Sequence, residues 1–177
     1  ARPIIVLMKI RARDGHDAFD SEYQNDPTAS EDAPFHNSLH YWHTLPNNLL
    51  YFGACDPSLG KFGKQRDPSA IGIGGFDREN GILYIVKMLI KKRLPDRIIS
   101  DIIELQRQYM CIAWAIESVQ FQEFLRTELV KRSAKMGVPV PAVPVHPHAD
   151  KELRIEALQP HCANGLILFH TEQTTVI

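Results

Sequence analysis

The sequence predicts an α/β fold in which a mixed β-sheet is flanked by helices. A continuous apolar run at residues 49–55 is followed by two strand-like segments, 70–76 and 82–90, and an Asn80-Gly81 turn signal joins the last two. Helix and strand patterns then alternate from residue 95 onward. A three-strand antiparallel meander followed by β-α-β crossovers gives a sheet with antiparallel and parallel strands.

The composition is that of an ordinary globular chain with one sizeable core. Its 177 residues are 44% hydrophobic and 23% charged, with a formal net charge of −1, so no overall basic field indicates nucleic-acid binding. Cys55, Cys111 and Cys162 lie far apart, which argues against a zinc site and favours a reducing compartment. We expect neither a signal peptide nor a membrane span, because apolar runs such as residues 3–8 are too short.

Residues 1–48 differ from the rest of the chain. Residues 4–8 can form a strand and residues 14–23 a short helix, but a polar, proline-containing stretch with few periodic apolar residues follows. We therefore interpret residues 1–48 as an N-terminal arm or linker and residues 49–177 as the folded domain. Because the chain begins at Ala1, we expect it to be an excerpt of something longer.

Two helices and a strand follow the meander. Pro95 suits a helix first turn, and the apolar stripes after it include Tyr109 and Met110. Residues 112–116 read as a short buried strand. Ser118 can cap a second helix, which carries apolar residues at four-residue spacing: Phe121, Leu125 and Leu129.

The remaining segment predicts an edge strand, a helix and a last strand. Residues 138–145 contain three prolines, which restricts them to an edge strand or an extended segment. Asp150 caps a helix that we expect to turn Ile155 and Leu158 inward and to end at Pro160, before a strand at residues 166–169.

Two acids, Asp56 and Glu117, each end an otherwise apolar strand. If these strands are neighbours in the sheet, the two carboxylates emerge together, and a cation between them would relieve their repulsion. Mg²⁺ suits such a pair because it takes hard oxygen ligands and keeps waters. The alternative for either acid alone is a polar residue where a strand reaches solvent.

The motifs around these acids resemble the nuclease domain of the large terminase subunit of tailed bacteriophages. The similar segments cover residues 17–170 in the family's order and are Glu22-Tyr-Gln-Asn-Asp-Pro27, Gly53-Ala-Cys-Asp56-Pro-Ser-Leu-Gly60, Asp67-Pro-Ser-Ala-Ile71, Gly81-Ile-Leu-Tyr84, Ile116-Glu117-Ser-Val-Gln-Phe-Gln122, Lys151-Glu-Leu-Arg154-Ile, and Leu158-Gln-Pro160 through Asn164-Gly165.

The resemblance implies a ribonuclease H-like fold and an enzyme that cuts concatemeric double-stranded viral DNA with two divalent metals, Mg²⁺ or Mn²⁺. Asp56 and Glu117 match two of the family's metal-binding and catalytic acids, and Asp67 matches an additional acid near the site. The family's third acid lies on a helix beyond the last strand, so the resemblance implies a domain truncated at Ile177. In such a site two metals roughly 3.5–4 Å apart activate the attacking water and stabilise the leaving oxygen.

The resemblance also implies partners and a location. No glycine-rich phosphate-binding motif ending in Gly-Lys-Ser or Gly-Lys-Thr occurs, so the packaging ATPase is absent, and residues 1–48 would join the domain to it. Implied partners are double-stranded DNA, the rest of the large subunit, the small terminase subunit and the portal, with no membrane. The expected location is the cytoplasm of an infected bacterial host or lysogen, without secretion.

Basic residues near these motifs are candidate DNA contacts. Lys61, Lys64 and Arg66 precede Asp67 in a segment that either reaches phosphates or is a solvated loop. Lys151 and Arg154 have the same two interpretations, because a surface ion pair with Asp150 or Glu156 is the plain alternative.

Two other functions fit the same residues. The first is another ribonuclease H-like nuclease, a junction resolvase or transposase core, which would share Asp56 and Glu117 and differ in substrate. The second is a non-catalytic DNA- or protein-interaction domain on this fold, which the missing third acid makes plausible.

Overall fold

The computed structural model describes residues 35, 38–57, 68–117, 122–146 and 150–171. Its elements follow the order predicted for the domain, with an added first strand and a divided last helix. They are β1 (His40–Trp42), β2 (Leu50–Asp56), β3 (Ser69–Asp77), β4 (Ile82–Lys91), α3 (Pro95–Tyr109), β5 (Ala113–Glu117), α4 (Gln122–Lys135), β6 (Ala142–Val145), α5 (Lys151–Glu156), α6 (Gln159–Ala163) and β7 (Ile167–His170).

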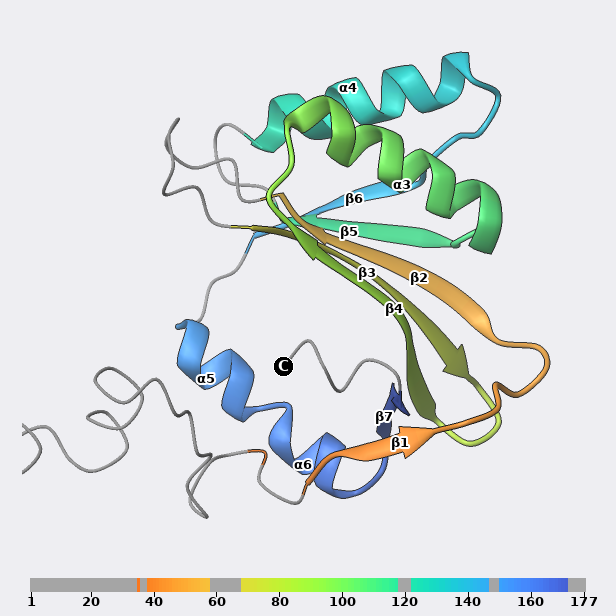
Figure 1. Ribbon diagram of the computed structural model, residues 1–177, viewed down its shortest axis with the longest axis vertical. Coiled ribbons are helices and arrows are strands. Elements are labelled where there is room, and N and C mark those ends of the chain that lie inside the picture. The colour runs from red at the N-terminus through yellow and green to blue at the C-terminus, as the bar shows by residue number, and fades with distance from the viewer. Residues whose placement is uncertain (1–34, 36–37, 58–67, 118–121, 147–149, 172–177) are drawn as a thin grey trace, which may run out of the picture. The chain divides into compact units, whose positions relative to one another are not determined.

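The strands form one mixed sheet in the order β1-β7-β4-β3-β2-β5-β6 (Figure 1). β2, β3 and β4 are the antiparallel meander, whereas β5 pairs parallel to both β2 and β6, and β7 pairs parallel to both β4 and β1. The predicted mixed sheet is therefore confirmed. β6 lies at an edge, as predicted for the proline-containing segment 138–145, because proline cannot donate to a neighbouring strand.

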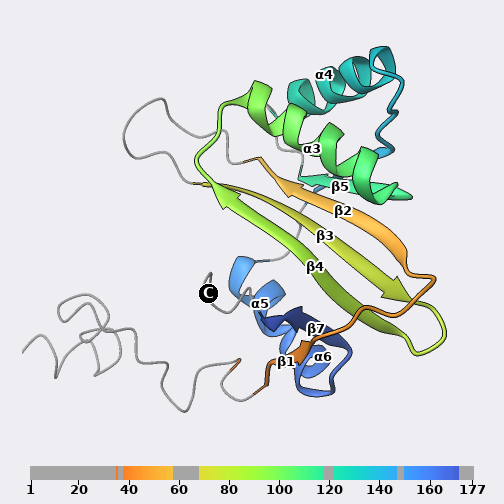
Figure 2. The same ribbon diagram turned by 45° about the vertical axis from the view of Figure 1, so that its right-hand side comes forward.

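Helices α3 and α4 cover one face of the sheet, while α5 and α6 lie on the other side (Figures 1 and 2). The main core fills the space beneath α3 and α4, and its fully buried large side chains are Ile71, Ile73, Ile98, Ile102, Trp114, Ile116 and Leu129. α3 begins at Pro95 as predicted, since proline lacks only an N–H that a first turn leaves unbonded. Met110, predicted on its apolar stripe, instead ends the helix in a left-handed conformation and is 77% exposed.

The two faces of β2 differ in what covers them. Gly53 and Cys55 point into the buried layer under the helices, whereas Phe52, Ala54 and Asp56 are exposed on the other face. This alternation is the two-residue period of a strand. The strand thus sends apolar and small groups inward and carries Asp56 to the accessible side at its carboxyl end.

Three features of the outer elements differ from the sequence predictions. β1, within the predicted arm, pairs with β7, and the Trp42 indole donates a hydrogen bond of 3.1 Å to the Ile85 carbonyl. The predicted inward packing of Ile155 and Leu158 is wrong, because they are 41% and 47% exposed and no residue of α5 is buried. Pro160 lies in the first turn of α6 and so begins a helix rather than ending one.

None of the helices in the described part of the chain combines the length and the apolar character needed to cross a bilayer.

Candidate active site

Asp56 and Glu117 come together at one end of the sheet. β2 and β5 are parallel neighbours whose last paired residues are Cys55 and Ile116, and each acid is the next residue along its strand. Hydrogen-bonded strands lie about 4.8 Å apart, so the two carboxylates share one small region. The predicted juxtaposition of these acids is confirmed, while their catalytic and metal-binding roles stay predictions.

The acids open onto a cavity of about 280 Å³ on the sheet face opposite α3 and α4. Its floor consists of small residues on three strands, Ala54, Ala70, Gly72 and Ala115, and Met88 and Val145 also line it. Asp56 is exposed and Glu117 is half-buried, so both carboxylates are accessible from this space. The small side chains leave room that larger ones would fill. This floor was not predicted from the sequence, although the small residues two apart at positions 70 and 72 are a signal for it.

On the helix-covered face, β2 and β5 approach each other closely at Gly53 and Trp114. A Cβ atom added at Gly53 would lie 2.2 Å from the Trp114 ring, so only glycine admits this indole. Trp114 is fully buried and donates a hydrogen bond of 2.7 Å from its indole N–H to the Gln106 side chain on α3. The indole therefore ties the acid-bearing strands to the helix layer.

Cys55 lies beside Asp56 but on the buried face of β2. Burial, and next the negative charge of Asp56, raises the pKa of the Cys55 thiol to about 12. The thiol is therefore neutral at physiological pH, when it is a poor nucleophile and a poor metal ligand. The charged oxygen donors of this region are the two carboxylates.

Arg154 reaches the same cavity from α5. Asp150 begins this helix by accepting a hydrogen bond of 2.8 Å from the Glu152 N–H, as predicted for a capping residue. In the part of the chain that the structure describes, neither Lys151 nor Arg154 pairs with Asp150 or Glu156, so the plain alternative of a surface ion pair is not realised. Lys151 is exposed on α5 and does not line the cavity.

Four predicted site residues, Lys61, Lys64, Arg66 and Asp67, lie outside the described residues.

The donor set fits part of a site for a hard divalent cation. Two carboxylates at adjacent strand ends supply the oxygen ligands that Mg²⁺ or Mn²⁺ takes, and the accessible cavity leaves space for waters. Among the described residues, no group of three or more His, Cys, Asp or Glu side chains gathers at one point. Asp56 and Glu117 would thus provide two ligands of a larger set.

Comparison with solved structures identifies the fold. The large terminase of bacteriophage HK97 aligns with a TM-score of 0.54 and 12% identity over 81% of this chain and 34% of that protein. The nuclease domain of the large terminase of P22 aligns with a TM-score of 0.52 and 15% identity over 77% of this chain and 69% of that domain. The large terminase of a thermophilic bacteriophage aligns with a TM-score of 0.52 and 16% identity over 78% of this chain and 33% of that protein.

The chain therefore has the ribonuclease H-like fold predicted from its sequence. The resemblance to the nuclease domains of large terminases is confirmed at the level of this fold. The chain spans about one third of the full-length terminases that it matches. No family model matches the sequence, and no curated protein matches it.

Proposed function

We propose that this chain is the divalent-metal-dependent endonuclease domain of a viral DNA-packaging terminase and cuts concatemeric double-stranded DNA. The observation that carries the proposal is the placement of Asp56 and Glu117 at the carboxyl ends of adjacent parallel strands. The same fold occurs in the P22 protein described as a large terminase nuclease domain. The carboxylates of Asp56 and Glu117 lie neither in the buried core nor at a helix cap, and both line the same cavity.

The residues of the cavity would have different roles in phosphodiester hydrolysis. Asp56 and Glu117 would hold Mg²⁺ or Mn²⁺, with Asp67 as a further acid, and the bound metals supply an activated water and charge stabilisation at the phosphate. The floor of small residues admits the sugar-phosphate backbone to the acids. Arg154, whose side chain has no partner among the described residues, supplies a positive charge to the phosphate oxygens.

The proposal includes a setting for the domain. An ATPase domain would precede it through residues 1–48, with residues 49–177 as the nuclease domain. The small terminase subunit, the portal and DNA would be its partners in the cytoplasm of the infected bacterium. Lys61, Lys64, Arg66 and Lys151 would contact phosphates outside the cavity.

Cleavage assays on isosteric variants test the proposal. Asp56→Asn and Glu117→Gln keep shape and remove charge, and each should slow Mg²⁺- or Mn²⁺-dependent cutting of plasmid DNA roughly 100- to 1000-fold. Thermal melts should stay near those of the unaltered chain, because Asp56 is exposed and Glu117 is half-buried. Glu79→Gln, in the turn between β3 and β4, is the control with the same charge change and should cut normally.

Three results would count against the proposal. Normal cutting by both isosteric variants would show that Asp56 and Glu117 are not catalytic residues. A strong preference for branched junctions over linear duplex would favour a resolvase-like nuclease. A chain that binds DNA but cuts none with any divalent metal would be an interaction domain.

A further inference from the structure

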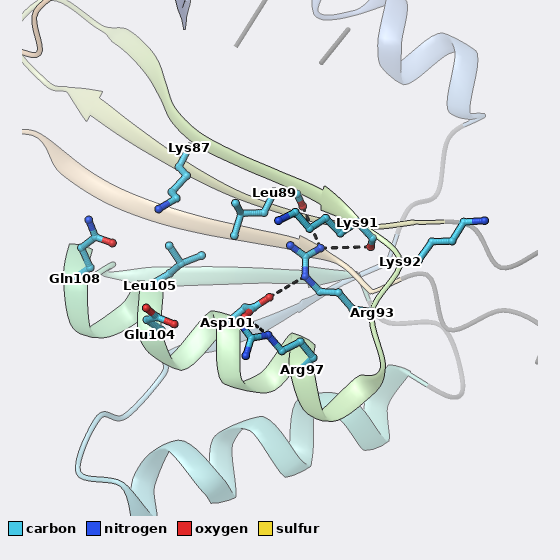
Figure 3. A pocket seen from close by; sticks show the side chains of 10 residues that line it. All are labelled: Lys87, Leu89, Lys91, Lys92, Arg93, Arg97, Asp101, Glu104, Leu105 and Gln108. Atoms are coloured by element: carbon cyan, nitrogen blue, oxygen red, sulfur yellow. Dashed lines mark hydrogen bonds and ion pairs between the residues drawn. The ribbon is translucent and has the colours of Figure 1, made fainter. Parts of the chain in front are cut away.

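A second cavity, of about 340 Å³, lies on the helix-covered face of the sheet between β4 and α3 (Figure 3). Lys87, Leu89 and Lys91 line it from β4, and the facing wall is a stripe of α3 that includes Arg97 and Glu104. We call this cavity the β4–α3 groove. Its lining includes five basic and two acidic side chains, which leaves a formal charge of +3, in a chain whose net charge is −1.

The positive charge of the groove is available to a ligand. Asp101 is already occupied, because one carboxylate oxygen accepts a bond of 2.8 Å from Arg93 and the other accepts a bond of 2.9 Å from Arg97 (Figure 3). Arg93 is buried there and also donates to backbone carbonyls of β3 and β4. The side chains of Lys87, Lys91 and Lys92 make no ion pair or hydrogen bond within the described ranges.

A β-bulge turns Lys87 into the groove. The pairing of β3 with β4 shifts between Ile73 and Gly74, so that Lys87 opposes Ile73 and Ile85 opposes Gly74. With regular alternation Leu83, Ile85, Lys87, Leu89 and Lys91 would all share one face. The bulge reverses the facing between Ile85 and Lys87, so Lys87, Leu89 and Lys91 lie on the helix-covered face, whereas Leu83 and Ile85 lie on the other. Bulges commonly redirect side chains beside a functional site.

One end of the groove, at Lys91 and Lys92, lies at the same end of the sheet as the acids, although the acids are on the other face. Pairing across the sheet sets Asp56 opposite Ala70, and Ala70 opposite Ile90, the residue before Lys91. At about 4.8 Å per strand, the end of β4 lies roughly 10 Å from Asp56 and roughly 14 Å from Glu117. A duplex carries one phosphate of each strand per 3.4 Å of its axis, so that span corresponds to about three to four base pairs along the axis, or approximately one major-groove width.

We propose that Lys87, Lys91 and Lys92 of the β4–α3 groove hold the sugar-phosphate backbone of the DNA beside the cut. The inference rests on the proposed nuclease function and adds a path for its substrate, from the acid pair across the strand ends to β4. Lysine suits this task because a phosphate backbone needs point charges and no base-specific geometry. An extended acidic peptide is the competing ligand, and the test separates the two.

Salt-dependent binding of a fluorescein-labelled 30-base-pair duplex, in Ca²⁺ without cutting, tests the proposal in the full chain. Each lysine–phosphate contact adds about 0.9 to the slope of log affinity against log salt. The triple variant Lys87→Gln, Lys91→Gln, Lys92→Gln should therefore flatten the slope by about 2 to 3. The double variant Lys91→Gln, Lys92→Gln should flatten the slope by about 2. It keeps the half-buried Lys87, so it tests the proposal even if the Lys87 substitution disturbs folding. The control Lys131→Gln, Lys135→Gln on α4 should leave it unchanged.

Methylphosphonate substitution then locates the contact. One neutral phosphate about three to four base pairs from the cut should weaken binding to the unaltered chain and have no effect on the triple variant. An unchanged salt slope in both lysine variants would overturn the inference. So would lysine variants that lose binding to a deca-glutamate peptide but bind DNA as well as the unaltered chain does. Both readouts are independent of cleavage, so an inactive chain would refute the proposed nuclease without deciding this contact.

Discussion

At the scale of single residues, Gly53 determines how closely the acid-bearing strands approach. The Trp114 indole occupies the space where any other residue would carry its Cβ atom. Asp56 and Glu117 follow these two paired residues by three positions on each strand, so their separation depends on this contact. A small residue that supports packing thereby sets the geometry of the cavity.

We predict that Gly53→Ala destabilises the protein by about 1 to 3 kcal/mol, the usual effect of inserting a methyl group into a packed core. The fully buried indole cannot move aside without breaking its bond to Gln106. Chemical unfolding measures the free energy. Gly81→Ala would not be a matched control because of its positive φ, so Ala54→Gly on the exposed face serves instead. A Gly53→Ala variant as stable as the unaltered chain would show that the strands can separate freely.

At the scale of elements, a buried ion pair joins the end of β4 to α3. Arg93 contacts Asp101 at 2.8 Å, and their side chains are only 4% and 11% exposed. Arg93 also donates to the Ser69 carbonyl at 3.2 Å, which adds the start of β3 to the same junction. This ion pair was not predicted from the sequence, because Arg93 stands in a run of basic residues that is typical of a solvated surface.

We predict that Asp101→Asn costs about 3 to 5 kcal/mol of unfolding free energy, since it removes a carboxylate charge that is paired with the buried Arg93 guanidinium. Arg97→Gln removes the other partner of Asp101, but the Arg97 side chain is 69% exposed, so this control should cost less than about 1 kcal/mol. Denaturant titration compares them. Equal effects of the two variants would mean that burial does not distinguish these ion pairs.

At the scale of the whole molecule, the buried thiols couple stability to alkaline pH. Burial raises the pKa of Cys55 to about 12 and that of Cys111 to about 11, above the ordinary value of 9.0. The folded state therefore keeps thiol protons that the unfolded chain releases above about pH 9. This contribution to stability is complete below pH 9 and is lost as pH rises to the folded values.

We predict that the unfolding free energy falls more steeply with pH in the unaltered chain than in Cys55→Ala between pH 9 and about 12. The difference in slope should approach about 1.4 kcal/mol per pH unit, the value for one proton. Cys55→Ala also loses packing, so the slopes and not the absolute free energies are compared. Parallel curves would indicate that Cys55 titrates normally in the folded protein.

The order of the main strands and helices could be predicted from the sequence, and so could the position of an acid at the end of β2 and of β5. These features depend on neighbouring residues: apolar runs, Asn80-Gly81, Pro95 and the capping residue Asp150 were all read correctly. The exposed outer helix α5 was predicted less well, because its apolar spacing resembles that of a buried helix although no residue of α5 is buried.

The contacts between segments far apart in the chain are visible only in the folded structure. It placed β2 beside β5, added β1 to the sheet and brought Arg154 to the acids. It also paired Arg93 with Asp101 and turned Lys87 into the β4–α3 groove through a bulge. Local patterns cannot specify these contacts, because strand neighbours, buried ion pairs and register shifts depend on packing between residues far apart in the chain.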